Sequence, residues 1–307
     1  MAMAIWKSPV VNKAFSTMVF FLQLLLDGVS TGFLYGISAV GLILIYRSGG
    51  FLNFAHGGMM AFGAFLFFAL SVWADWPIIL SFVVTLASSF TLGLILERCI
   101  IRPVFRTENL IHKILIVLGL ALMLKGLLSF IFGNGNYHFP LLISKVFSFG
   151  RHSLQITSFH GLAFIAGIGL LSLYWFFFTV SPQGLSMRAF ADNPPAARAM
   201  GVRINKVFAL SWAIAALFCT VSGVALSLLN GLNADSLSTT ALKVFPVILL
   251  GGINRIGGAI LGGILIGLLE TLTGGYISTS LQDLMPYAAL ILILIFKPSG
   301  LLGRKEQ

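Results

Sequence analysis

Residues 28–46 read Gly-Val-Ser-Thr-Gly-Phe-Leu-Tyr-Gly-Ile-Ser-Ala-Val-Gly-Leu-Ile-Leu-Ile-Tyr, a stretch without a charged side chain. A helix needs about 20 mostly apolar residues to cross the hydrocarbon of a bilayer, and this stretch has that length. Gly28, Gly32 and Gly36 recur every four residues, so they share one face of a helix. Because small residues let helix backbones approach in a membrane, the stretch predicts a transmembrane helix packed closely on a neighbour.

Further apolar stretches of similar length follow along the chain. The last part is harder to divide, because Leu242–Leu272 is interrupted by two glycine pairs with Arg255 between them, and Leu284–Phe296 is short. The pattern predicts an all-α fold, a polytopic membrane helix bundle with about eight apolar segments, one or two of them broken or re-entrant. The stretches that resemble the first are Phe51–Trp73, Pro77–Cys99, Ile111–Phe132, Phe159–Val180 and Val207–Leu229.

The composition supports a membrane protein and excludes a soluble one. Of the 307 residues, 58% are hydrophobic and 9% are charged, and the mean hydropathy is +1.00. Such a chain cannot cover a globule with polar surface. The net charge of +10 comes from Lys and Arg at the ends of apolar segments, where they set topology and contact anionic lipid. We therefore expect membrane lipid as a partner and no nucleic acid.

Two basic loops set the orientation, since cytoplasmic loops carry an excess of Lys and Arg. We assign both loops and the basic C-terminal tail to the cytoplasm. Three apolar segments lie between Lys206 and Lys297, an odd number, so one of them must be broken or re-entrant. The interruption around Arg255 is the natural place for this break. Backbone groups that lose their helical hydrogen bonds at membrane depth are tolerated where protein or a water-filled cavity covers them. The basic residues are Arg98, Arg102, Arg106 and Lys113, then Arg188, Arg198, Arg203 and Lys206, and in the tail Lys297, Arg304 and Lys305.

The N-terminal half leaves two arrangements open. Three segments precede the loop at Arg98, whereas Lys7 and Lys13 favour an N-terminus inside. Either residues 51–58 form an irregular element, or the N-terminus lies outside. Residues 1–26 are expected to form an uncleaved amphipathic lead-in, because their apolar run is short and leads directly into the next segment.

The run Asp192-Asn-Pro-Pro-Ala-Ala-Arg-Ala-Met-Gly201 predicts a short basic helix between two long apolar segments. Asn is a favourable cap, Pro suits the first turn, and Gly can end a helix in a left-handed turn. The helix presents Ala and Met, which fits insertion into a groove on a soluble partner. The alternative is an ordinary basic cytoplasmic loop. The candidate docking residues are Asn193, Ala196, Ala197, Arg198, Met200 and Gly201.

Patterns that suggest catalysis do not hold in this context. Residues 28–32 match Gly-x-Ser-x-Gly, but that nucleophile turn lies between a strand and a helix, and these residues begin a membrane helix. Residues 252–259 begin like a phosphate-binding loop, yet Gly258 and Ala259 stand where Lys and Ser or Thr must be. The histidines and acids have no metal-ligand or acid–base spacing, and Cys99 and Cys219 indicate no zinc site. We expect neither an enzyme nor a bound cofactor or metal.

Several stretches together resemble one family. Gly41–Tyr46, Phe51–Gly57, Arg188–Val202, Leu250–Gly263 and the ending Lys297–Arg304 occur in an order and spacing similar to those of the permease subunits of bacterial ABC importers for branched-chain amino acids, the LivH/LivM type. The resemblance covers nearly the whole chain from about residue 26. Residues 196–201 match part of the Glu-Ala-Ala-x-x-x-Gly coupling motif of ABC permeases, with Pro in place of the Glu.

The resemblance implies a passive half-channel in the bacterial cell inner membrane. A paralogous permease subunit or a second copy of this chain would complete the path, two cytosolic ABC ATPase subunits would drive it, and a periplasmic or lipid-anchored solute-binding protein would deliver the solute. Branched-chain amino acids, urea, amides and aromatic amino acids stay open as solutes. The chain would divide into the lead-in 1–26, a permease domain 27–303 with a coupling loop at 182–206, and a cytoplasmic tail 304–307. The alternative is a stand-alone secondary transporter, which usually has paired ionisable groups at mid-membrane.

A few polar or glycine positions are candidates for the path. Asn53 and His56 interrupt an apolar run, so we expect them at the inner wall beside the path; the alternative is that they only satisfy backbone groups at a bend. Four ionisable residues near apolar segments could line a path; the alternative is that they snorkel, which we expect for the two lysines. They are Asp27, Lys125, Lys243 and Glu270. Residues 251–258 are expected to form a helix junction buried in protein. The candidate path residues are Asn53, His56, Gly57, Gly252 and Gly257.

Overall fold

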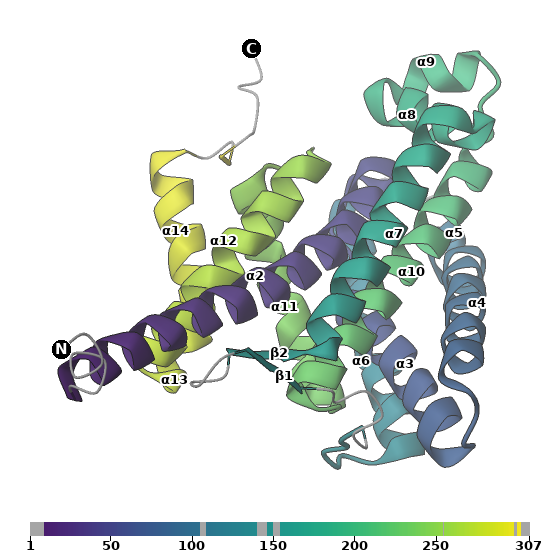
Figure 1. Cartoon of the computed structure of the whole chain (residues 1–307). Coiled ribbons are helices and arrows are strands. Elements are labelled where there is room, and N and C mark those ends of the chain that lie inside the picture. The colour runs from purple at the N-terminus through teal and green to yellow at the C-terminus, as the bar shows by residue number, and fades with distance from the viewer. Residues whose placement is uncertain are drawn as a thin grey trace.

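The computed structural model describes residues 9–104, 109–139, 146–149, 154–253, 255–297 and 300–301. Helices packed side by side make up the bundle (Figure 1), so the predicted all-α membrane fold is confirmed. Within the described residues, seven helices are long and apolar enough to cross a membrane, or eight when one bent pair is taken as a span. Two short strands, β1 (Val146–Phe149) and β2 (Leu154–Thr157), pair in antiparallel fashion.

The elements follow the predicted segments closely in most places. They are α2 (Pro9–Gly49), α3 (His56–Phe68) with a π-helical turn η1 (Ala69–Trp73), α4 (Ile78–Leu96) with a second such turn η2 (Glu97–Ile101), α5 (Arg102–Val104), α6 (Leu110–Phe132), α7 (Ser158–Val180), α8 (Pro182–Asp192), α9 (Pro194–Ala199), α10 (Ile204–Asn230), α11 (Ala234–Gly251), α12 (Ile256–Tyr276), α13 (Thr279–Gln282) and α14 (Met285–Phe296).

The first described helix, α2, is one unbroken element of 41 residues. It contains the predicted span 28–46 and continues back to Pro9 through the boundary that we placed after residue 26. Its glycines lie against α12: a Cβ added at Gly32 would stand 2.5 Å from the carbonyl oxygen of Gly263. The predicted close contact of the glycine face with a neighbouring helix is confirmed, and the partner helix is α12.

Residues 51–55 are not helical, so the irregular element predicted at 51–58 is present over these five positions, and α3 begins at His56. Figure 1 shows α2 rising toward α8, α3 descending and α4 rising again to α5. Because α4 leads to the basic loop at Arg98, this alternation favours the outside N-terminus over the inside one. The irregular element therefore does not replace a crossing.

The predicted bounds near the C-terminus are wrong. Leu242–Leu272 is not one interrupted segment: α11 already begins at Ala234, and the glycine-rich interruption separates it from α12, each helix being long enough to cross. The predicted helix junction at 251–258 is present, and Gly252 adopts φ +95° there. The expectation that the whole junction is buried in protein is wrong, because Arg255 and Gly257 are exposed. The Leu301 N–H donates to the Leu250 oxygen at 2.7 Å, so the junction lies beside the basic tail. After Lys206, α10, α11 and α12 are each long enough to cross a membrane, whereas α13 has 4 residues and the apolar α14 has 12. Because Leu301, which follows α14, meets Leu250 at the junction of α11 and α12, α14 returns the chain to the side of that junction.

The buried core lies where α2, α3, α10 and α11 meet. Trp212 and Phe218 of α10, Phe65 of α3 and Leu34 of α2 have almost no exposed surface. By contrast, most side chains of α4 and α6 are exposed or only partly buried. Apolar surface on the outside of a bundle is stable in lipid and not in water, so these two helices are suited to face lipid.

Candidate functional site

One end of the bundle presents the short helices α8 and α9 (Figure 1). The helix pair α7 and α8 is bent by 81° at Ser181, whose side chain accepts a hydrogen bond from the Gly184 N–H at 2.9 Å. Asn193 caps α9 in the predicted way, by accepting from the Ala196 N–H at 3.0 Å. Gly201 follows with φ +83°, a conformation that favours glycine. The predicted capped helix with a glycine stop is therefore present.

The candidate docking residues divide into two faces. Ala197 is 4% exposed and packs into the chain's own core, whereas Met200 is 86% exposed. Asn193, Ala196 and Arg198 are exposed as well. A partner would therefore meet Met200 and Ala196, while Ala197 anchors the helix to the bundle.

A buried carboxylate lies at the same end of the bundle. Glu97 of η2 has a side chain only 2% exposed and accepts a forked pair of hydrogen bonds from Arg102, at 3.0 and 2.8 Å. These bonds raise the pKa of Arg102 above its usual value. A small pocket beside the start of α10 is bordered by Glu97, Arg102 and Arg198. Arg198 therefore lies across this pocket from the Glu97–Arg102 ion pair.

Asn53 and His56 are fully buried and have partners within the chain. The Asn53 side chain accepts from the Ala55 N–H at 3.0 Å, which satisfies the backbone at the bend before α3. His56 Nε2 lies 2.7 Å from Ser38 Oγ, and its Nδ1 lies 3.2 Å from Cys219 Sγ. These contacts tie the start of α3 to α2 and α10.

The three candidate path glycines have different surroundings. A Cβ added at Gly57 would stand 2.9 Å from the Ser238 Cα, so this glycine lets α3 approach α11. Gly252 ends α11 by its positive φ. Gly257 is exposed and an added Cβ would meet nothing within 4 Å.

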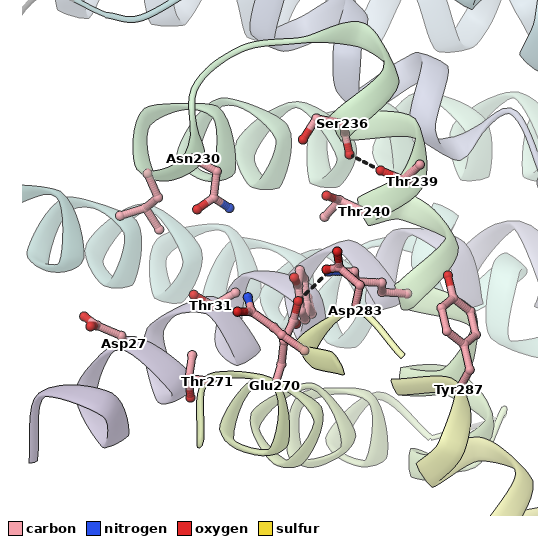
Figure 2. A pocket seen from close by; sticks show the side chains of 14 residues that line it. Asp27, Thr31, Asn230, Ser236, Thr239, Thr240, Glu270, Thr271, Asp283 and Tyr287 are labelled. Carbon is pink, nitrogen blue, oxygen red and sulfur yellow. Dashed lines mark hydrogen bonds and ion pairs between the residues drawn. The ribbon is translucent and has the colours of Figure 1, made fainter. Parts of the chain in front are cut away.

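A polar cavity of about 690 Å³ lies at the other end of the bundle (Figure 2). It is bounded by α2, the end of α10, the beginning of α11, the end of α12 and the start of α14. None of the five candidate path residues lines it. The lining residues are Asp27, Thr31, Tyr35, Leu229, Asn230, Ser236, Thr239, Thr240, Lys243, Glu270, Thr271, Gln282, Asp283 and Tyr287.

Three charged side chains meet in the wall of this cavity (Figure 2). Lys243 of α11 donates to Oε1 of Glu270 on α12, and to Oδ1 of Asp283 at 2.7 Å. The Lys243 side chain is 11% exposed, that of Glu270 is 4% exposed, and that of Asp283 is 71% exposed. The prediction that Lys243 snorkels is wrong, because it is held by two carboxylates. Lys125 also has an acidic partner, because its ammonium group forms an ion pair with Asp235.

The sequence pointed to Asp27, Lys243 and Glu270 as possible path-lining residues but missed the rest of this cavity. Ser236, Thr239 and Thr240 fall in a polar stretch that hydropathy excludes from a membrane segment, yet they begin α11. Lys243 and Glu270 are 27 residues apart and Lys243 and Asp283 are 40 apart, so no local spacing connects them. The available signal was the presence of both ionisable residues inside apolar segments.

Comparison with known proteins gives consistent matches over the whole chain. The family model described as "Branched-chain amino acid transport system / permease component" matches residues 24–294. The chain is 29% identical to the high-affinity branched-chain amino acid transport system permease protein LivH of Escherichia coli (strain K12), over 94% of this chain and 97% of the relative. It is 28% identical to the permease protein BraD of Pseudomonas aeruginosa, over 93% and 97%.

Among solved structures, PsaBC from Streptococcus pneumoniae in complex with Fab matches with a TM-score of 0.47 and 15% identity, over 91% of this chain and 92% of that chain. That likeness is too weak to support a structural argument. The family match and the span-length helices confirm the predicted multi-pass protein of the inner membrane. Because the family model covers most of the chain, the protein belongs to the family of branched-chain amino acid transport system permease components.

Proposed function

We propose that the chain forms half of the membrane path of an ATP-driven importer whose solute is a branched-chain amino acid or a similar small polar solute. The relatives LivH and BraD are named as permease proteins of such transport systems, and their matches run almost end to end. The observation that carries the proposal is the arrangement of the two ends: an exposed, capped helix pair at one and a polar cavity at the other.

The proposed contact with a cytosolic ATPase is α9 and its flanking residues, within a coupling loop at 182–206. The exposed side chains of Ala196, Arg198 and Met200 support this proposal, and Asn193 and Gly201 fix where the helix begins and ends. Two ATPase subunits would hydrolyse the ATP, so this chain is a transport subunit and not an enzyme. A second permease subunit, paralogous or identical, and a periplasmic or lipid-anchored binding protein would complete the importer.

The proposed path passes through the polar cavity. Gly57 would support its wall, since it lets α3 approach α11, whose other side chains line the cavity. Asn53 and His56 would support it indirectly, because they fix the bend before α3 and tie the start of α3 to α2 and α10. Gly252 and Gly257 would contribute to the turn at the opposite end of α11, where the chain continues into α12. The permease domain would take in residues 27–303, with 304–307 as a cytoplasmic tail; these last residues lie outside the described part of the chain.

A stand-alone secondary transporter is the second candidate, and one observation favours it. Lys243 and Glu270 form a buried ion pair, and such pairs serve ion-coupled transport in many secondary transporters. The exposed helix pair α8–α9 has no obvious use in a transporter that works alone. We therefore rank the ATP-driven importer first.

The proposal can be tested by purifying the tagged chain from its native membrane in mild detergent and identifying its partners by mass spectrometry. We expect two ATPase polypeptides or two copies of one, together with a second permease, and ATP hydrolysis in the purified complex. Recovery of the chain alone or as a homo-oligomer, active in solute uptake without any ATPase, would contradict the proposal. Met200→Asp is the matched variant, which should release the ATPases and keep the permease partner.

A further inference from the structure

The lining of the polar cavity has an uneven charge. Asp27, Glu270 and Asp283 contribute three carboxylates, and Lys243 contributes the single ammonium group among the described lining residues. Most of the other lining side chains end in hydroxyl or amide groups. Because negative formal charge exceeds positive, the cavity favours a cationic group over an anionic one.

One carboxylate oxygen of Glu270 has no hydrogen-bond partner of good geometry among the described residues. Oε1 accepts from Lys243, and the side chain as a whole is 4% exposed. Oε2 is buried and accepts no hydrogen bond of good geometry from the described residues, and the Tyr35 hydroxyl interacts with the carboxylate only outside that geometry. A buried carboxylate oxygen without a donor is unfavourable. A donor brought into the cavity would remove that cost.

Lys243 holds Glu270 in position through Oε1, and Asp283 in turn holds Lys243. The Lys243 ammonium has three donors, and two of them are used by Glu270 and Asp283. Asp283 lies between α13 and α14, and its side chain is 71% exposed. The Lys243–Glu270 ion pair is therefore held by Asp283 from the exposed side of the cavity.

We infer that Glu270, positioned by Lys243 and Asp283, receives the primary ammonium group of the transported solute. The inference rests on the proposed function and narrows its solute to an α-amino acid, since urea and simple amides have no ammonium group. An ammonium group has three donors, so it can bond Glu270 and also hydroxyl groups of the lining such as Thr31 and Thr240. A cavity of about 690 Å³ is within the usual range for small-molecule sites and has room for a branched side chain.

The first experiment measures ATP-driven uptake of L-leucine by the complete importer in proteoliposomes. Glu270→Gln keeps the size of the side chain and removes its charge, and we expect uptake to fall about tenfold or more, as for the loss of a charged hydrogen bond. ATPase stimulation by the loaded binding protein should stay near the wild-type level, because the docking surfaces are unchanged. A purely structural role would lower both.

A matched control removes the acidic group of Asp235, which lies on the same side of the bundle as Glu270 but does not line the cavity. Asp235→Asn breaks only the exposed pair with Lys125, and uptake should stay at the wild-type rate. If Glu270→Gln fails to assemble, the double variant Lys243→Met with Glu270→Met replaces it, since removing both charges leaves neither buried and unpaired. We expect it to assemble and to lose uptake equally. Wild-type uptake of L-leucine by either Glu270 variant would overturn the inference and leave the proposed function intact.

A second measurement needs no variant of the charged residues. Thr239→Cys places a thiol in the cavity lining, in a Cys99→Ser background because Cys99 is exposed and Cys219 is buried. L-leucine should slow labelling of this thiol by a maleimide, whereas 4-methyl-2-oxopentanoate, which has the same branched chain and no ammonium group, should not. Equal protection by both compounds, or by neither, would overturn the inference. A wild-type importer that carries urea or isovaleramide and no amino acid would contradict the proposed solute itself.

Discussion

The residues of α9 have separate roles because the helix has one face against the bundle and one face outward. Ala197 is buried and Met200 is exposed, although both belong to the same apolar set in the sequence. The sequence predicts the helix, its Asn193 cap and its Gly201 stop, since these depend on neighbours in the chain. It does not predict which alanine faces the bundle, because that depends on α8 and α10.

The first prediction separates these faces. Met200→Asp should fold normally and lose ATPase stimulation by the loaded binding protein, because the added charge lies only in the proposed partner contact. Ala197→Asp should instead destabilise the chain by more than about 3 kcal/mol, since it buries an unpaired carboxylate. The measurements are ATPase rates in the reconstituted complex and thermal unfolding of the purified chain. Normal ATPase stimulation in Met200→Asp would show that α9 is an ordinary solvated loop.

The second prediction concerns the glycines around the junction of α11 and α12. Gly252→Leu should damage folding by about 1–2 kcal/mol or more, because its φ of +95° is unfavourable for residues with a side chain. Gly257→Leu should be tolerated, since an added Cβ there meets nothing within 4 Å. Protein yield and thermal stability of the two variants check this. A larger loss of stability in Gly257→Leu than in Gly252→Leu would contradict the described conformation of the junction.

At the scale of elements, the contact between α2 and α12 depends on glycines from both helices. Gly32 and Gly263 face each other so closely that neither position has room for a side chain. In a membrane, where apolar burial contributes little to association, close backbone approach supplies much of the attraction between helices. This pair therefore holds α2 against α12.

The third prediction tests that contact. Gly263→Leu should separate α2 from α12 and lower stability by about 1–3 kcal/mol, the usual cost of overpacking. Gly126→Leu is the control, because Gly126 lies within α6, is exposed, and has open space around it. Thermal unfolding in detergent compares the two. Equal stability of both variants would contradict the close helix contact.

Most elements could be predicted from hydropathy alone, and the exceptions have physical causes. The spans corresponding to α4, α6, α7 and α10 need only a local run of apolar residues, so their ends agree with the sequence within a few positions. The beginning of α11 was missed because its side chains are polar, and they are polar because they line a cavity instead of lipid. Hydropathy detects contact with lipid and not the presence of a helix.

At the scale of the whole molecule, the two ends of the bundle differ in chemistry. One end has exposed short helices, and the other has a polar cavity with a buried charge cluster. The partners within this cluster could not be predicted, because Lys243, Glu270 and Asp283 are brought together only by the packing of α11 on α12 and α14. The sequence shows where each of these charged residues lies along the chain, but it does not show that they pair with one another.

The fourth prediction uses accessibility to locate the path within the bundle. Cysteines at Thr239 and Ser236, which line the cavity, should react with small water-soluble thiol reagents, in the background without Cys99. Cysteines at Asn53 and His56 should be protected in every nucleotide state, because both positions are fully buried and hydrogen-bonded within the chain. Fast labelling at Asn53 or His56 would place the path against α3 instead.

The central claim is that this permease subunit moves an amino acid only when partner ATPases hydrolyse ATP, and uptake by proteoliposomes tests it most directly. Vesicles holding the complete complex, with ATP inside and L-leucine presented by the binding protein outside, should accumulate L-leucine, and ionophores that collapse proton and sodium gradients should leave the rate unchanged. Vesicles with the purified chain alone should show no uptake under a gradient. Gradient-driven uptake by the chain alone, without ATP, would contradict the account and identify a secondary transporter.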